Sequence, residues 1–248
     1  MGWAGTFVLG RGYAAYFGKA GANTAHQHGA IQLVLATENN AAVYDQHGNC
    51  TSARRILIRP LIPHKLRALS DLVSIYVEPQ TELGRALLEE ASYMGISVFE
   101  ETKHLMFDDD DPESILTKLD VLAIRPSVEI DVRLLNAMNL LGQTDTQSLI
   151  SDAAKASGVS VSTLRLLAKR DLGLPLGTWL VWRKLGRAAK ALSENASLVE
   201  AAYVGGFSDQ AHFCRVMKRM FGITPRTAAK ILKWRSRNKS IAYTGIYG

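Results

Sequence analysis

The C-terminal half of the chain contains the same layout twice, and this repeat is the feature that most constrains the fold. In residues 148–175, a short helix rich in small residues leads through a glycine turn to a longer helix that stops at Gly173. Residues 197–225 repeat that order and stop at Gly222. A short helix, a tight turn and a longer helix form a helix-turn-helix unit. The sequence therefore predicts two such units in tandem.

Serine residues predict where these helices begin, because a serine hydroxyl can accept a hydrogen bond from a backbone N–H of the first helical turn. Ser160 and Ser208 precede the two longer helices, and we expect them to be the N-caps. Ser197 and Glu200 have the spacing of a capping box at the start of the second unit.

The longer helix of the second unit has two different faces. Its apolar residues recur at the spacing of a buried stripe: Phe213, Val216, Met217 and Met220. A polar and cationic stripe is made of Ser208, Gln210, His212, Arg215 and Arg219. An α-helix fits the major groove of DNA, where Arg and Gln can pair with two atoms of a base edge. The polar stripe is therefore a candidate base reader, with Lys218 and Arg226 as candidate phosphate contacts. A solvated helix in an ordinary bundle would show the same two faces.

The charge distribution favours a nucleic-acid partner. Residues 1–132 contain 11 Lys/Arg and 17 Asp/Glu, whereas residues 133–248 contain 18 and 6, so net charges of −6 and +12 are joined in one chain. Residues 176–195 predict one amphipathic helix between the two units. Its inner face would be Leu180, Leu185, Ala188, Ala189 and Leu192, and its outer face Arg183, Lys184, Arg187 and Lys190. At ~1.5 Å per residue, this helix could hold the two readers about one turn of double-stranded DNA apart.

The N-terminal half has a different pattern. Short apolar runs separated by turn residues up to about residue 77 predict an antiparallel barrel or sandwich. Helical periodicity then predicts helices at 83–106 and 113–124, the second with Asp111 as N-cap. We therefore expect an α+β chain of two domains: residues 1–125 form an antiparallel β-barrel with trailing helices, and residues 131–235 form an all-α domain. Exposed apolar faces on the trailing helices would make the protein a homodimer.

No apolar run approaches the ~18 residues that a membrane helix needs, so we expect no membrane partner. Two cysteines in 248 residues favour a reducing compartment, and the cytoplasm is the expected location.

The segment "GFSDQAHFCRVMKRMFGITP", together with "RKLGRAAKAL" and "VEAAYVGGF", resembles the AraC/XylS family of transcription regulators. The resemblance covers about residues 131–230. It implies two helix-turn-helix units joined by a linker helix, specific DNA binding, and most often activation by contact with RNA polymerase. By position, Gln210, His212 and Arg215 would read bases in the second unit. Ser162 and Arg165 would do so in the first, with Lys169 among the phosphate contacts. Leu166 and Ala168 depart from the family pattern.

The N-terminal motifs "HQHGAIQLV" and "RPLIPHKLRA" are similar to the small cupin barrels found ahead of this DNA-binding domain, which implies a small-molecule effector. His26, His28, Gln32 and His64 fall where metal-binding cupins place ligands, and neutral imidazole suits a divalent Zn, Fe, Cu or Ni ion. The same residues could instead hydrogen-bond one another or line a ligand pocket. A metal-dependent oxygenase or isomerase fused to a nucleic-acid-binding domain is the alternative. The regulator is the predicted function, without catalytic residues.

Overall fold

A computed structural model describes residues 2–91, 95–99, 111–123, 127, 129–143, 150–225, 228 and 232–236. Its N-terminal part is built of antiparallel strands in two sheets. The larger sheet has the order β10-β1-β2-β8-β3-β6-β9, and the smaller one has the order β5-β4-β7. The strands are β1 (Ala4–Leu9), β2 (Tyr13–Ala20), β3 (Ile31–Ala36), β4 (Ala41–Asp45), β5 (Cys50–Ala53), β6 (Arg55–Ile58), β7 (His64–Leu66), β8 (Leu69–Val77), β9 (Ile96–Val98) and β10 (Leu232–Ser236).

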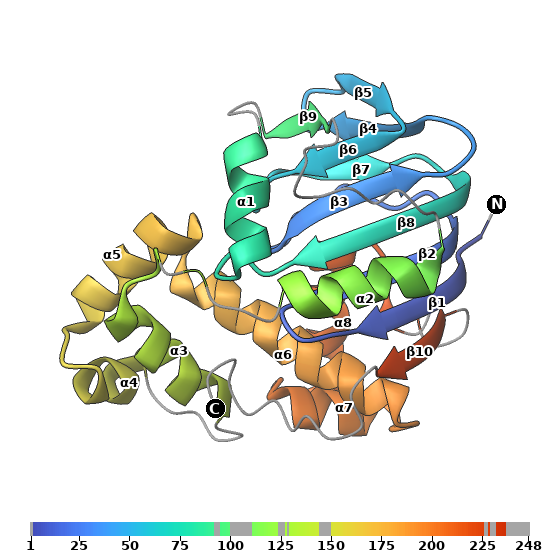
Figure 1. Ribbon diagram of the computed structural model, residues 1–248. Coiled ribbons are helices and arrows are strands. Elements are labelled where there is room, and N and C mark those ends of the chain that lie inside the picture. Colours follow the sequence, from blue (N-terminus) through green and yellow to red (C-terminus); the bar gives the residue numbers. More distant parts are fainter. Residues whose placement is uncertain are drawn as a thin grey trace.

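The predicted closed barrel is wrong. Within the described residues, the pairings give two separate sheets, and the larger one ends in free edges at β9 and β10. Figure 1 shows this sheet as an open, twisted surface. The coarser prediction, an N-terminal antiparallel sheet followed by a mainly helical C-terminal part, is confirmed.

Both faces of the larger sheet are buried, which explains why its strands are apolar almost throughout. Successive strand residues point to opposite faces. On β1, for example, Phe7 and Leu9 belong to one buried cluster and Val8 to another. The same alternation separates Tyr16 from Ala15 on β2. Each face must therefore be covered by another layer.

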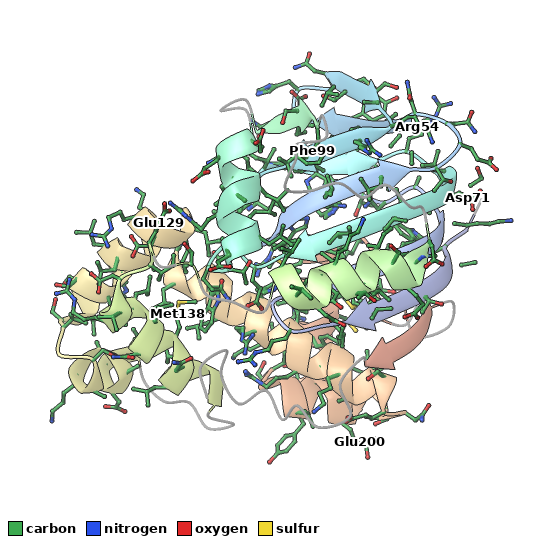
Figure 2. All side chains as sticks on the ribbon, in the orientation of Figure 1. Arg54, Asp71, Phe99, Glu129, Met138 and Glu200 are labelled. Carbon is green, nitrogen blue, oxygen red and sulfur yellow. The ribbon has the colours of Figure 1, made fainter. Side chains whose placement is uncertain are left out.

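Helices α1 (Glu82–Glu90) and α2 (Pro112–Leu122) cover one face. Leu87 and Leu119 are buried in this layer, and Phe99, labelled in Figure 2, joins it just beyond β9. Asp111 caps α2 as predicted, accepting from the Ser114 N–H at 2.9 Å. The helix expected over 83–106 ends at residue 90, and β9 follows it. Residues 100–106 lie outside the described residues.

The predicted route to a homodimer is also wrong, because the apolar faces of α1 and α2 are packed on the chain's own sheet. The homodimer itself stays a prediction.

The C-terminal helices form the two predicted units, which lie at opposite ends of α6 (Figure 1). The elements are α3 (Val132–Gln143), α4 (Ile150–Ala156), α5 (Val161–Leu172), α6 (Leu176–Ser193), α7 (Leu198–Gly205) and α8 (Gln210–Phe221). Gly173 and Gly222 end α5 and α8 in the left-handed conformation. Ser160 caps α5, and the capping box of Ser197 and Glu200 is present.

The second unit is not a separate body. Trp182 of α6 and Phe213 and Met217 of α8 share one buried cluster with Phe7 and Tyr16 of the sheet. The chain then returns to that sheet, where β10 pairs in parallel with the edge of β1. The expectation that residues 131–235 are all helical is therefore wrong at its end. Among the described residues, no helix is both long and apolar enough to span a lipid bilayer.

Candidate DNA-binding surface and the buried sites beneath it

Helix α5 presents one polar face to solvent. Ser162, Arg165 and Lys169 are all exposed on it, at spacings of three and four residues. Leu166 lies among them with 66% of its surface exposed, whereas Ala168 is buried. The predicted reading residues of the first unit thus lie together on the surface, beside an apolar side chain whose exposure has no packing reason.

Helix α8 has the predicted two faces. Phe213, Val216, Met217 and Met220 are buried, and Gln210, Arg215, Lys218 and Arg219 are exposed. His212 is half-buried, with its ring edge-on to Phe207 at 5.5 Å between ring centres. Arg226 lies outside the described residues.

The predicted N-cap of α8 is wrong by one residue. Asp209 is the cap, and its carboxylate accepts from the His212 N–H at 2.6 Å. That bond lowers the pKa of the Asp209 carboxyl. The Ser208 hydroxyl instead lies 3.0 Å from His212 Nδ1 and donates to Asp209 at 3.1 Å. Ser208 therefore orients two neighbours at the start of α8.

The outer face predicted for α6 is wrong at Arg183. This residue is 5% exposed, and its Nη1 donates to Glu78 Oε1 at 3.1 Å. Lys184 and Arg187 have other roles: they donate to the carbonyl oxygens of Gly206 and Gly205 and thus fix the end of α7.

The last turn of α8 is attached to the N-terminal half by backbone contacts. The Gln27 N–H donates to Arg219 O at 3.2 Å, and the Thr24 N–H donates to Gly222 O at 3.4 Å. The Thr24 hydroxyl donates to the same oxygen at 3.2 Å. Because Arg215, Lys218 and Arg219 still have exposed side chains, this docking leaves the cationic face of α8 accessible.

A cavity of about 70 Å³ lies between the sheet and the second unit. A space of this size holds about five waters or part of a small apolar ligand. Its walls are mostly aromatic and aliphatic, with residues such as Phe7, Tyr16, Tyr76, Trp182, Phe213 and Met217. Burial raises the pKa of Tyr16 and of Tyr76 to about 12, so both phenols are neutral. The charged groups in the wall are Glu78 and Arg183, and they neutralise each other.

The structure brings His26, His28, Gln32 and His64 together, but none of them is among the residues that line this cavity. All four are buried; His26 and His28 lie in the loop before β3, His64 is the first residue of β7, and a backbone bridge joins His26 to His64. Gln32 Oε1 lies 2.9 Å from Nε2 of both His28 and His64. Burial lowers the pKa of His26 to about 3 and lowers those of His28 and His64, so the imidazoles are neutral.

Comparisons with known proteins agree with this architecture. A family model described as a helix-turn-helix domain matches residues 153–231. The chain is 39% identical over 77 residues to the probable transcription factor PqrA of Proteus vulgaris, and 36% identical over 78 residues to the putative regulator YkgA of Escherichia coli. Each match covers 31% of this chain, and they span 63% and 33% of those relatives.

The whole fold also has solved counterparts. A 1.65 Å structure of ToxT from Vibrio cholerae superimposes with a TM-score of 0.57 and 11% identity, covering 90% of this chain and 99% of that one. The structure of ToxT with a bound unsaturated fatty acid superimposes with a TM-score of 0.56 and 10% identity, covering 94% of this chain and 98% of that one. The two-part arrangement is therefore an established fold.

Proposed function

We propose that this chain, whose C-terminal part is a helix-turn-helix domain of the AraC/XylS family, is a sequence-specific transcription regulator that responds to a small ligand. The observation that carries the proposal is the pair of exposed polar and cationic helix faces, on α5 and α8, in a half-chain of net charge +12. Operation in the cytoplasm, activation through RNA polymerase and homodimer formation belong to the same proposal.

For DNA reading, we assign base contacts to Gln210, His212 and Arg215 of α8. Arg215 is exposed in the middle of the helix, where a guanidinium can pair with both acceptors of a guanine edge. Ser162 and Arg165 would read the other half-site. Ser208 and Arg219 complete the DNA-contacting stripe of α8. Lys169, Lys218 and Arg226 would contact phosphates, which sets affinity and salt dependence but carries no sequence information.

Selection of bound fragments from a random DNA pool tests this assignment. The expected result is a split motif with half-sites about 10 base pairs apart. Arg215→Ala should lose preference at one base position and weaken binding by about 1–3 kcal/mol. Lys218→Ala should weaken binding to all DNA sequences equally and reduce the slope of the logarithm of the binding constant against the logarithm of the salt concentration by about one. Recovery of unselected sequence, or identical behaviour of the two variants, would refute base reading by α8.

For the effector, we propose a largely apolar, uncharged molecule in the cavity between sheet and α8. ToxT has been solved with an unsaturated fatty acid bound and with a methylnaphthalenyl butenoic acid bound, but the cavity here already holds a carboxylate, since Glu78 neutralises Arg183. A second buried carboxylate beside Glu78 would meet a like charge without a free cation.

The matching test compares a short-chain unsaturated fatty acid with the corresponding alcohol, by calorimetry on the full chain. The parent should bind the alcohol better than the acid. Glu78→Gln removes the negative charge beside Arg183 at constant volume and should improve binding of the acid about tenfold. Equal or stronger binding of the acid by the parent would remove the uncharged-ligand proposal without affecting DNA reading.

The oxygenase or isomerase alternative depends on the three histidines. Among the described residues, the clustered ligand group contains no carboxylate. An iron enzyme of the facial-triad type uses two histidines and one carboxylate, so the donor set here favours binding over oxygen activation.

A further inference from the structure

We propose that His26, His28, His64 and the amide oxygen of Gln32 bind one divalent transition-metal ion, and that this ion fixes the loop on which α8 docks. Their ligand atoms are close enough: each histidine offers one nitrogen, and these atoms all lie within 4.8 Å of one another. The set of three imidazoles and one carbonyl oxygen suits Zn²⁺, Co²⁺ or Ni²⁺.

The second nitrogen of each ring already has a partner. Every Nδ1 faces a backbone carbonyl oxygen, so its hydrogen is used there and the lone pair remains on Nε2. The carbonyls are those of Thr24 for His26 at 3.0 Å, Ala30 for His28 at 3.0 Å and Ile62 for His64 at 2.8 Å. Metal-binding histidines in proteins are oriented by this kind of outer contact.

Proton counting shows what is missing between Gln32 and the rings. A neutral imidazole has one N–H, yet both nitrogens of His28 and of His64 lie within 3.0 Å of an oxygen. With each hydrogen on Nδ1, both Nε2 lone pairs face the lone pairs of Gln32 Oε1. A cation between these three atoms turns the repulsion into attraction. Ligands about 2.1 Å from an ion and at right angles lie ~3.0 Å apart, which agrees with the two distances of 2.9 Å.

The rest of the Gln32 amide supports this orientation. Its Nε2 donates to the Ser74 hydroxyl at 2.7 Å and lies 3.5 Å from the Tyr76 hydroxyl. The competing arrangement is an amide rotated by 180°, whose NH₂ group donates to both imidazole nitrogens and closes the site to metal. These two arrangements predict opposite results for metal binding.

The position of the site gives the ion a structural effect. His26 pairs with His64 through both backbone groups at 2.9 Å, and Gln27, between two of the ligands, donates to Arg219 of α8. The ring centre of His28 lies 6.5 Å from that of Phe221. An ion bound to both His26 and His64 stabilises the surface on which α8 docks. The consequence for DNA binding rests on the proposed function, whereas the metal site does not.

The first experiment titrates the metal-free full chain with ZnCl₂ and with CoCl₂, followed by calorimetry, the visible spectrum of Co²⁺ and metal analysis after dialysis. One ion per chain is expected. Gln32→Glu should bind about tenfold more tightly, because an anionic oxygen replaces a neutral one at the same place. It should also gain more in Tm on adding metal than the parent does.

His28→Ala should lose the ion, and His47→Ala is the matched control because that histidine is exposed and does not belong to the cluster. Absence of stoichiometric metal in the parent and in Gln32→Glu, or equal loss in His47→Ala, would overturn the site and leave the rotated amide. DNA binding is then measured with and without Zn²⁺ on the selected motif. Selective DNA binding by a chain that binds no metal refutes this inference alone, and stoichiometric metal without selective DNA binding refutes the proposed function alone.

Discussion

Replacement of Gly222 by alanine should detach α8 from the N-terminal half of the protein. Gly222 has φ +71°, a conformation that costs an ordinary residue about 1–2 kcal/mol. A Cβ there would lie 2.5 Å from the carbonyl oxygen of Thr24, well inside the 3.4–4 Å of ordinary contact. The two backbone segments would have to separate by about 1 Å, which breaks the hydrogen bonds from Thr24 and Gln27 at about 0.5–1.5 kcal/mol each. The expected cost is therefore about 3–4 kcal/mol.

The structure supplies a matched control. Gly173 ends α5 of the first unit in the same conformation, with φ +69°, but nothing lies within 4 Å of its missing Cβ. Gly173→Ala should therefore cost only the backbone strain, about 1–2 kcal/mol.

Urea unfolding followed by circular dichroism measures both costs, and the metal titration described above is repeated on each variant. The free energy of unfolding of Gly222→Ala should be about 2 kcal/mol lower than that of Gly173→Ala. Gly222→Ala should also bind metal more weakly, because the loop that carries His26 is released. If the two variants differ by less than about 0.5 kcal/mol, the docking contacts contribute nothing and the inferred attachment of α8 is refuted.

Three further predictions concern the cavity and the first unit. Arg183→Met should lower the free energy of unfolding in urea by about 3–5 kcal/mol, because the Glu78 carboxylate is left buried without its cation. Adding Glu78→Met should restore most of that stability. A loss below about 1 kcal/mol in Arg183→Met alone would contradict this expectation. Tyr16 and Tyr76 each have a folded pKa of about 12 against 10 unfolded, so the folded state keeps protons that the unfolded state loses, and each tyrosine should lower stability by about 1.4 kcal/mol per pH unit between pH 10 and 12. Tyr16→Phe should remove its own half of that slope and one of the two late-ionising phenols at 295 nm. Leu166→Ala should leave stability within about 0.5 kcal/mol but weaken binding where the selected site carries thymine, because the methyl contact is lost; unchanged binding to that site would remove Leu166 from the interface.

The helical half could be predicted in most of its detail because its signals are local. The capping box of Ser197 and Glu200 and the glycine stops at Gly173 and Gly222 act within one turn of their own helix. The N-cap of α8 was harder, since Ser208 and Asp209 are both good caps and lie side by side. The turn geometry decides between them, and that depends on how Phe207 packs.

The larger errors involve partners that are distant in sequence. Helical periodicity places Arg183 on the outer face of α6, but its partner Glu78 is 105 residues away. The strand at 232–236 pairs with β1 at the other end of the sequence, and the segment "LKWRS" carries no local signal that predicts a parallel partner. Whether the N-terminal strands close into a barrel depends on which edge strands pair. The alternation of residues along each strand is the same in a closed barrel and in an open sheet, so it cannot distinguish the two.

The charge asymmetry of the sequence suggested two modules, yet one core joins them, and this fixes how a ligand can act. Phe213 and Met217 bury α8 and at the same time line the cavity whose opposite wall is formed by Phe7 and Tyr16. A ligand there cannot contact one half of the protein without contacting the other. If its affinity differs between the docked and undocked positions of α8, DNA affinity must change by a linked factor, and DNA must change ligand affinity equally. A ligand bound equally well in both positions would leave DNA binding unchanged, however tightly it binds.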